Sequence, residues 1–226
     1  MSADRLIVAL DLPSLEEARA FAGRLAGVVR RVKVGLELFA AAGPEAVRAL
    51  RADGFEVMLD LKLHDIPETV AQATARLADL GADLLTVHTK GGRKMMESAA
   101  KAAAGKTKVI GVTVLTSMSE TDLAEVGITA ALPEVVLQRA KLARSAGLDG
   151  VVCSPREVGF LRDELGPDFL LVTPGIRVAV GGDDQQRVAT ASAARQAGAD
   201  LVVVGRPIRD AADPRAAAEA LVRELR

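Results

Sequence analysis

Glu56-Val57-Met58-Leu59-Asp60-Leu61-Lys62 is a β-rich run that ends in alternating charged and apolar residues, and His64-Asp65-Ile66-Pro67-Glu68-Thr69 follows it as a turn and the start of a helix. Successive side chains of a strand point to opposite faces, so Asp60 and Lys62 share one face and the neighbouring leucines lie on the other. In a closed barrel the first of these faces borders the interior. The stretch therefore predicts a strand, a tight turn and a helix, with an Asp and a Lys together at a barrel mouth.

The same alternation of short apolar runs and amphipathic helical stretches continues along all 226 residues without a break in composition. Eight such runs predict an α/β fold, a single-domain (β/α)8 barrel (TIM barrel) that comprises residues 1–226. An open doubly wound sheet is the alternative, but no Gly-rich dinucleotide loop follows the first run. The expected strands are Leu6 to Asp11, Val32 to Leu36, Glu56 to Lys62, Leu84 to Thr89, Lys108 to Leu115, Gly150 to Ser154, Leu170 to Pro174 and Leu201 to Gly205.

Short glycine-containing motifs precede three of these strands. Gly-Ala-Asp occurs at residues 81–83 and 198–200, and Gly-Leu-Asp occurs at residues 147–149. A glycine in this position typically ends a helix and begins a tight turn into the next strand. We expect these residues to serve the fold rather than the chemistry.

Composition and charge exclude several classes of function. A net charge of -1 and a pI near 6.2 give no general attraction to nucleic acid or anionic membranes, so a bound anion must be held by a local site. The absence of Trp and Tyr removes the usual stacking platforms for single-stranded nucleic acid. No apolar run approaches the roughly 20 residues of a membrane span, and the amino terminus has no signal-peptide pattern. We expect a cytoplasmic protein without a nucleic-acid or membrane partner.

The content of Cys and His argues against a metal centre. Cys153 lies in a short apolar run, where we expect a buried thiol rather than a reactive one. His64 and His88 are the two histidines of the chain, too few for a typical zinc site together with one Cys. We expect both to be structural residues near the barrel mouth, and we expect neither a metal site nor a cofactor.

The carboxyl ends of the strands are where (β/α)8 barrels build their active sites. Asp60 and Lys62 lie at such an end, and Lys33 occupies a comparable position on the neighbouring strand. Burying these charges is costly unless they have a use, so we favour a reaction centre over a salt bridge that only holds the barrel together. Asp65 follows after a tight turn, and its position fits a part of this centre and a helix N-cap before Pro67 equally well.

A phosphate site is predicted after the last strand. Gly205-Arg206 follows that strand, at the place where many barrels bind phosphate. A glycine lets its backbone N–H approach a ligand closely, and an arginine offers two parallel hydrogen bonds to phosphate oxygens. We expect Arg187 and Arg209, by contrast, to lie on the surface.

The pattern Asp-x-Lys-x-x-Asp-Ile/Val-x-x-Thr, met by Asp60, Lys62, Asp65, Ile66 and Thr69, resembles the signature of orotidine 5'-phosphate decarboxylases. Its short Asp-x-Lys-x-x-Asp part also occurs in related sugar-phosphate decarboxylases and aldolases, whereas the whole combination is specific. Glu68 replaces the Asn that is often found in the family, and we expect it to face away from the reacting atoms. Further segments follow in family order over the whole chain: Ala9-Leu10-Asp11, Lys33-Val34-Gly35, Leu115-Thr116-Ser117-Met118, Thr173-Pro174-Gly175-Ile176-Arg177 and Gly205-Arg206-Pro207-Ile208.

The resemblance implies a reaction and a role for each site residue. It implies that Lys62, held by Asp60 and Lys33, donates the proton when orotidine 5'-phosphate loses CO2 and becomes uridine 5'-phosphate, without a cofactor. It also implies that Asp65 and Thr69 reach into the active site of a partner, so that the protein is a homodimer with shared sites. The implied substrate contacts are Asp11 at the ribose, Thr116 or Ser119 at the pyrimidine amide, Gln185, Gly205 and Arg206 at the phosphate, and Pro174 and Arg177 elsewhere on the ligand.

Two other functions are compatible with part of the sequence pattern. A sugar-phosphate decarboxylase or hexulose-phosphate aldolase of the same superfamily would use Asp60 and Asp65 around Mg²⁺. The segments Ile66-Pro67 and Thr173 to Arg177 argue against that reading. A barrel that merely binds a phosphorylated metabolite would need Arg206 but would not need a lysine at the strand end.

Overall fold

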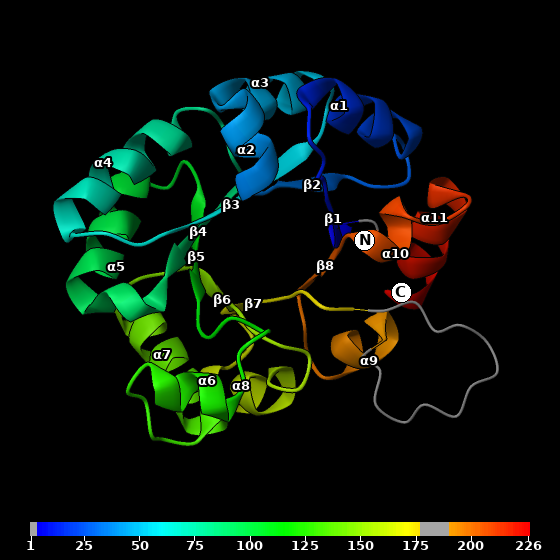
Figure 1. Cartoon of the computed structure of the whole chain (residues 1–226). Helices are drawn as coiled ribbons and strands as arrows, with labels where there is room; N and C mark the ends of the chain where they lie inside the picture. The colour runs from blue at the N-terminus through cyan, green and yellow to red at the C-terminus, as the bar shows by residue number, and fades with distance from the viewer. Residues whose placement is uncertain (1–3, 177–189) are drawn as a thin grey trace.

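The computed structural model describes residues 4–176 and 190–226. Its eight parallel strands form a closed barrel in the order in which they occur in the chain, which confirms the predicted (β/α)8 fold and excludes the open sheet (Figure 1). The strands are β1 (Leu6–Ala9), β2 (Arg31–Val34), β3 (Glu56–Leu63), β4 (Leu84–His88), β5 (Lys108–Val112), β6 (Gly150–Val152), β7 (Leu170–Thr173) and β8 (Leu201–Val204).

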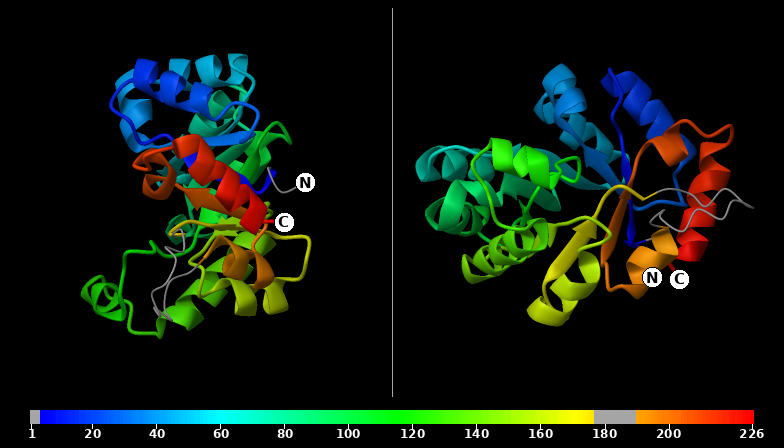
Figure 2. Two further views of the ribbon diagram at one scale, coloured as in Figure 1. Left: turned by 90° about the vertical axis from the view of Figure 1, so that its right-hand side faces the viewer. Right: turned by 60° about the horizontal axis from the view of Figure 1, so that its bottom comes forward.

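Helices surround the barrel, as both views in Figure 2 show. Several begin at a residue whose side chain caps the first turn, for example Ser14, which accepts a hydrogen bond from the backbone N–H of Glu17. The helices are α1 (Leu15–Arg24), α2 (Leu36–Ala42), α3 (Pro44–Ala52), α4 (Pro67–Ala78), the 3-10 turn η2 (Thr89–Gly91), α5 (Gly92–Ala103), α6 (Glu120–Glu125), α7 (Leu132–Ser145), α8 (Val158–Leu165), α9 (Ala191–Gln196), α10 (Arg206–Arg209) and α11 (Pro214–Glu224).

Most strands end earlier than their apolar runs predicted. β1 ends at Ala9 instead of Asp11, and β5 ends at Val112 instead of Leu115, because the ladder to the neighbouring strand stops there. Leu36 was expected in the second strand but is the first residue of α2. The residues beyond each ladder thus belong to the loops that surround the barrel mouth.

Alternation along the strands divides the apolar residues into two cores. On β1, Leu6 and Val8 belong to the core between barrel and helices, whereas Ile7 and Ala9 belong to the core inside the barrel. The interior is therefore packed with side chains below its mouth rather than open as a pore. The inner core consists of Ile7, Ala9, Met58, Leu84, Ile110, Val112, Val152, Val172, Leu201 and Val203.

The three glycine-containing motifs lock the amino-terminal ends of the strands. Asp83 Oδ2 accepts a hydrogen bond from the backbone N–H of Val57 (2.8 Å), and the backbone N–H of Asp83 donates to the carbonyl of Val57 (2.9 Å). Gly81 precedes this turn with the left-handed φ of 83° that favours glycine. The motifs thus serve the fold, as predicted, and the same pair of contacts joins Asp149 to Val109 and Asp200 to Leu171.

A bulge interrupts the ladder between β3 and β4. Leu59 pairs with Leu85 and Leu63 pairs with Val87, so the residues between the two β3 positions face a single residue of β4. Lys62 lies in this bulge with a φ of 51°, a left-handed conformation that costs a non-glycine residue about 1–3 kcal/mol. The sequence predicted a regular strand here, and the irregularity is concentrated at a candidate catalytic residue.

Cys153 is buried, and its Sγ lies 4.0 Å from Oγ1 of Thr173. Burial raises the pKa of its thiol to about 12, so the prediction of a buried, unreactive cysteine is confirmed.

Within residues 4–176 and 190–226, no three His, Cys, Asp or Glu side chains are grouped so that they could hold a metal ion. Among the helices of these ranges, none has the length and apolar character needed to cross a membrane.

Candidate active site

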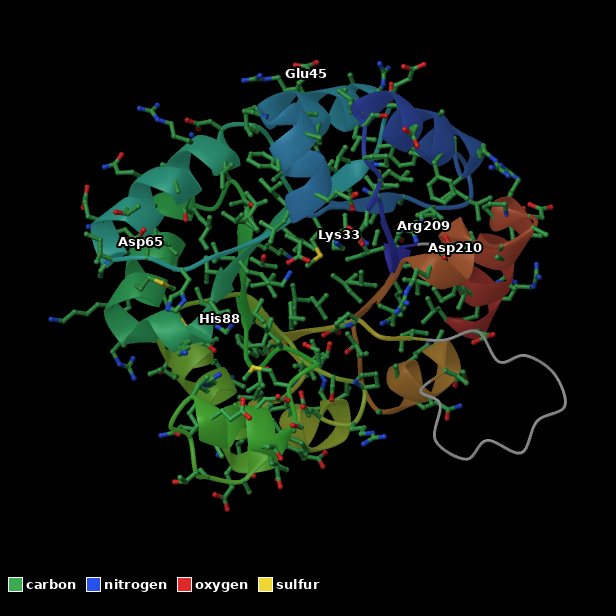
Figure 3. The ribbon with its side chains drawn as sticks, viewed as in Figure 1. Lys33, Glu45, Asp65, His88, Arg209 and Asp210 are labelled. Carbon is green, nitrogen blue, oxygen red and sulfur yellow. The ribbon has the colours of Figure 1, made fainter. Side chains whose placement is uncertain are left out.

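Four charged side chains of alternating sign meet at the carboxyl ends of β1, β2 and β3. Lys33 Nζ lies 3.0 Å from Asp11 Oδ1 and 3.6 Å from Asp60 Oδ2. Lys62 Nζ lies 2.9 Å from the other oxygen of Asp60. Lys33, in the middle of Figure 3, is thus placed between two carboxylates, whereas Lys62 ends the row and faces one. We call Asp11, Lys33, Asp60 and Lys62 the charged array.

The members of the charged array differ in exposure. The side chains of Lys33 and Asp60 are 11% and 13% exposed, and that of Lys62 is 32% exposed. Ion pairs are stronger where water is excluded, and each buried charge here faces an opposite one, which offsets its desolvation. Lys62 is therefore the ammonium group better placed to face a bound molecule.

A cavity of about 350 Å³ opens beside the charged array. Inner-core side chains such as Ala9 and Met58 line it, as do residues of the loops after β5, β7 and β8. A largely apolar pocket with a few convergent polar groups is typical of a small-molecule site. The predicted site residues that line the cavity are Asp11, Lys33, Asp60, Lys62, Thr116, Pro174, Gly205 and Arg206.

Gly35 packs closely against the charged array. A Cβ atom at this position would lie 2.8 Å from Asp11 Oδ1 and 2.9 Å from Lys33 Nζ, closer than real Cβ contacts. Any larger residue would therefore displace two charged side chains of the array. Sequence reasoning quoted Gly35 as part of a motif but gave it no role.

The arginine at the end of β8 borders the same cavity. Arg206 is exposed and lines the cavity, and within the described residues its guanidinium donates no hydrogen bond to the protein. Arg209 is partly buried, and its Nη1 donates to the backbone carbonyl of Asp11 (2.9 Å). The side chain of Arg209 keeps 28% of its surface exposed, in keeping with the expected surface position, and also contacts the loop after β1. Arg177, Gln185 and Arg187 lie outside the described residues.

Comparison with known proteins identifies the family. The model of the "Orotidine 5'-phosphate decarboxylase / HUMPS family" matches residues 4–221. The chain belongs to this family. Among curated orotidine 5'-phosphate decarboxylases, that of Chromobacterium violaceum is 53% identical over 224 residues (97% of this chain and 91% of the relative). That of Halorhodospira halophila is 51% identical over 225 residues (98% and 95%).

Solved structures of the same family have the same fold. Orotidine 5'-phosphate decarboxylase from Lactobacillus acidophilus is 41% identical, with a TM-score of 0.88 over 98% of this chain and 99% of that chain. The enzyme from Pyrococcus horikoshii is 28% identical, with a TM-score of 0.80 over 97% and 98%. The family signature read from the sequence therefore lies on a barrel of the expected kind.

Two candidates for a contact with the pyrimidine ring have different surroundings. Thr116 lines the cavity. Ser119 is the N-cap of α6, and it forms a capping box with Asp122, whose Oδ2 accepts a hydrogen bond from the Ser119 hydroxyl (2.6 Å). Ser119 does not line the cavity, and capping accounts for its side chain. The geometry therefore favours Thr116.

The signature residues after β3 do not line the cavity of their own chain. Asp65 and Thr69 are exposed, and Figure 3 shows Asp65 at the outer edge of the molecule, far from Lys33. Asp65 is not the N-cap of α4, since Ile66 occupies that position without a side-chain hydrogen bond. Glu68 on α4 accepts a hydrogen bond from Gln72 and does not line the cavity, as predicted.

The two histidines lie beside each other outside the cavity, with 5.5 Å between their ring centroids. Burial lowers the pKa of His88 to about 4, and the nearby His64 and Arg139 contribute to the shift. His88 Nδ1 accepts a hydrogen bond from the backbone N–H of Lys90. At neutral pH His88 is thus an uncharged residue that is held by the backbone, consistent with a structural role.

Proposed function

We propose that this protein is an orotidine 5'-phosphate decarboxylase that produces uridine 5'-phosphate and CO2 in the synthesis of UMP, with Lys62 as the proton donor. The observation that carries the proposal is the charged array beside the cavity, in which the more exposed ammonium of Lys62 lies 2.9 Å from Asp60. Membership of the family and the likeness to enzymes that are named for this reaction support it.

The reaction explains why a fixed cation is needed. When the bond between C6 and the carboxylate breaks, its electron pair stays at C6, where no conjugating group accepts it. The ammonium of Lys62 stabilises this charge and transfers a proton to C6, and solvent then reprotonates the resulting amine. Preorganised charges act without the cost of reorganising water, so the protein supplies what a cofactor would otherwise supply.

The other members of the charged array hold Lys62 in place. Asp60 binds the ammonium of Lys62, and its negative charge lies near the departing carboxylate and favours its loss. Lys33 faces the second oxygen of Asp60 and keeps that carboxylate oriented. The array thus positions one donor group and leaves its proton available to C6.

Substrate contacts away from C6 provide the binding energy for this reaction. Asp11 accepts hydrogen bonds from the ribose, and Thr116 contacts the pyrimidine amide, with Ser119 as the alternative. Gly205 and Arg206 hold the phosphate, and Gln185 completes this grip by resemblance to the family. Pro174 and Arg177 are further ligand contacts by resemblance to the family.

A second copy of the chain completes the site in this proposal. Asp65 and Thr69 are exposed and lie beside Ile66, a large apolar residue that is 65% exposed. A homodimer would cover this apolar side chain and place both polar residues in the partner's cavity. We further propose that the enzyme acts in the cytoplasm and binds no nucleic acid.

The decisive experiment follows the ultraviolet absorbance of orotidine 5'-phosphate in the presence of EDTA. The proposal expects the substrate to be consumed and uridine 5'-phosphate to appear at a rate that EDTA leaves unchanged. A sugar-phosphate decarboxylase or aldolase with Mg²⁺ at Asp60 and Asp65 would not consume this substrate and would lose its own activity with EDTA. A barrel that merely binds phosphorylated metabolites would bind the substrate without converting it.

Shared sites have a separate test. Lys62→Ala and Asp65→Asn homodimers are each expected to be nearly inactive. After subunit exchange, roughly half of the dimers are hybrids, and one site of each hybrid is wild type at both positions, so about a quarter of all sites regain activity. If verified exchange restores no activity, Asp65 acts in its own subunit and the shared-site proposal fails.

A further inference from the structure

Thr86 on β4 lies opposite the bulge of β3. Its side chain is fully buried inside the barrel. The Thr86 hydroxyl donates a hydrogen bond to Asp60 Oδ1 (2.9 Å), the same oxygen that binds Lys62. It also accepts a hydrogen bond from the backbone N–H of Lys62 (2.9 Å). One hydroxyl group thus joins the carboxylate and the backbone of two neighbouring members of the charged array.

The bulge explains why a side chain is needed at this point. Leu59 pairs with Leu85 and Leu63 with Val87, so Thr86 is the single β4 residue that faces the bulge between them. The backbone N–H of Lys62 donates its hydrogen bond to the Thr86 hydroxyl. In a regular ladder a backbone carbonyl of the neighbouring strand would accept this bond instead. A hydroxyl both accepts and donates, whereas an apolar side chain of the same shape does neither.

We infer that Thr86 is a positioning residue of the decarboxylation, which holds Lys62 in its left-handed conformation and orients Asp60 toward its ammonium. The inference rests on the proposed function. Thr86 does not line the cavity, so it acts through the array and not on the substrate. Strained backbone at a functional residue persists only where its surroundings fix it, and Thr86 provides that restraint.

The test compares Thr86→Val, which keeps the shape and removes the hydroxyl, with Thr86→Ser, which keeps the hydroxyl. Thr113→Val is the matched control, because Thr113 is equally buried and its hydroxyl donates to the backbone carbonyl of Val152 (3.0 Å), away from the array. We expect Thr86→Val to lower kcat at least tenfold with KM changed less than threefold. Thr86→Ser and Thr113→Val should stay within threefold of the wild type in kcat.

A second measurement separates positioning from mere support of the fold. Uridine 5'-phosphate has no charge at C6, whereas a 6-substituted analogue with an anionic C6 group depends on the placement of Lys62. Thr86→Val should weaken binding of the anionic analogue at least tenfold and leave the affinity for uridine 5'-phosphate nearly unchanged. If both ligands weaken by the same factor, or if Thr113→Val matches Thr86→Val, the positioning role is refuted.

Further variants distinguish a loss of folding from a loss of positioning, and an inactive wild type from an inactive Thr86 variant. Should Thr86→Val not fold, Thr86→Ala and Thr86→Ser replace it, since these two side chains differ in the hydroxyl oxygen alone, and equal kcat in this pair overturns the inference. A wild-type enzyme that does not decarboxylate orotidine 5'-phosphate refutes the proposed function. An active wild type with an equally active Thr86→Val variant refutes the role of Thr86 and leaves the proposed function intact.

Discussion

Three aspartates at the amino-terminal end of the barrel bind backbone N–H groups, and two aspartates at the carboxyl end lie beside ammonium groups. At the amino-terminal end, Asp83, Asp149 and Asp200 each accept a hydrogen bond from a backbone N–H of the strand next to them. At the other end, Asp11 and Asp60 lie beside lysines in the wall of a cavity. The same residue type thus fixes strands at one end and arranges charge at the other.

The backbone conformations differ between the two ends in the same way. Most positive φ angles of the amino-terminal turns fall on glycines such as Gly81, for which they cost little, and Ala104 before β5 is the exception. At the carboxyl end the positive φ falls on Lys62, and a Cβ at Gly35 would collide with the array. The strained residue at the cavity end is thus a member of the charged array, which predicts that mutations in the array change activity more than stability.

The largest effect is expected for Lys62→Met, which keeps the length of the side chain and removes its charge and proton. Loss of a general acid and of a fixed cation together should lower kcat by about 10⁴-fold or more. The thermal midpoint should stay close to that of the wild type, because Asp60 keeps its contacts to Lys33 and Thr86. Steady-state kinetics and calorimetry measure the two quantities. If Lys62→Met loses stability in proportion to activity, the charged array supports the fold as much as the reaction, and the two ends of the barrel do not differ in this respect.

Gly35→Ala should have the next largest effect. The added Cβ displaces the ends of the Asp11 and Lys33 side chains, and a displacement of about 1 Å in a catalytic site costs about 10²-fold in rate. Gly159→Ala is the control, because a Cβ at Gly159 meets nothing within 4 Å. We expect kcat/KM to fall in Gly35→Ala and to be unchanged in the control, with both proteins folded. Full activity of Gly35→Ala would mean that the array tolerates displacement.

Periodicity was sufficient to predict the fold and most of the array. Alternation along the apolar runs indicated eight strands, and it placed Asp60 and Lys62 on one face. The bulge at Lys62 could not be predicted in this way, since it depends on how β3 pairs with β4. Thr86 escaped notice for the same reason, because a threonine within an apolar strand has no recognisable partner until the register is known.

The role proposed for Asp65 in a partner's site also cannot be derived from one chain. Asp65 belongs to the family signature, yet it lies away from the cavity of its own chain, so sequence resemblance and not local geometry assigns its role. Arg209 was expected on the surface, where its side chain is partly exposed. Its contact with the carbonyl of Asp11 joins residues from opposite ends of the chain, which no local pattern indicates.

Asp200→Ala tests the amino-terminal end, where stability should change and activity should not. The substitution removes the acceptor of the Leu171 N–H and the ion pair with Arg162 (2.6 Å), and an unsatisfied buried donor costs about 1–3 kcal/mol. Asp163→Ala on the exposed face of α8 serves as the control. We expect a lower free energy of unfolding in urea with kcat/KM unchanged. A large loss of kcat/KM in the folded variant would contradict the division between the two ends.

At neutral pH the smallest effect is expected for His88, a structural residue that ends β4 near the barrel mouth. Its pKa is lowered from 6.5 to about 4 in the folded protein, chiefly by burial. Between these pH values the unfolded chain binds a proton that the folded chain does not, so the free energy of unfolding falls as the pH decreases from 6.5 to about 4. In His88→Gln this contribution is absent, and the loss of stability between pH 7 and about 4.5 should be smaller than in the wild type.

Urea unfolding of both proteins at the two pH values measures this difference. The groups that oppose protonation of His88 include His64, Arg139, Lys90 and Lys62, but burial is the larger cause. His64→Gln should therefore leave most of the pH dependence in place, whereas His88→Gln should remove the part that His88 contributes. If the two substitutions reduce the pH dependence equally, charge repulsion between the rings and not burial keeps His88 uncharged.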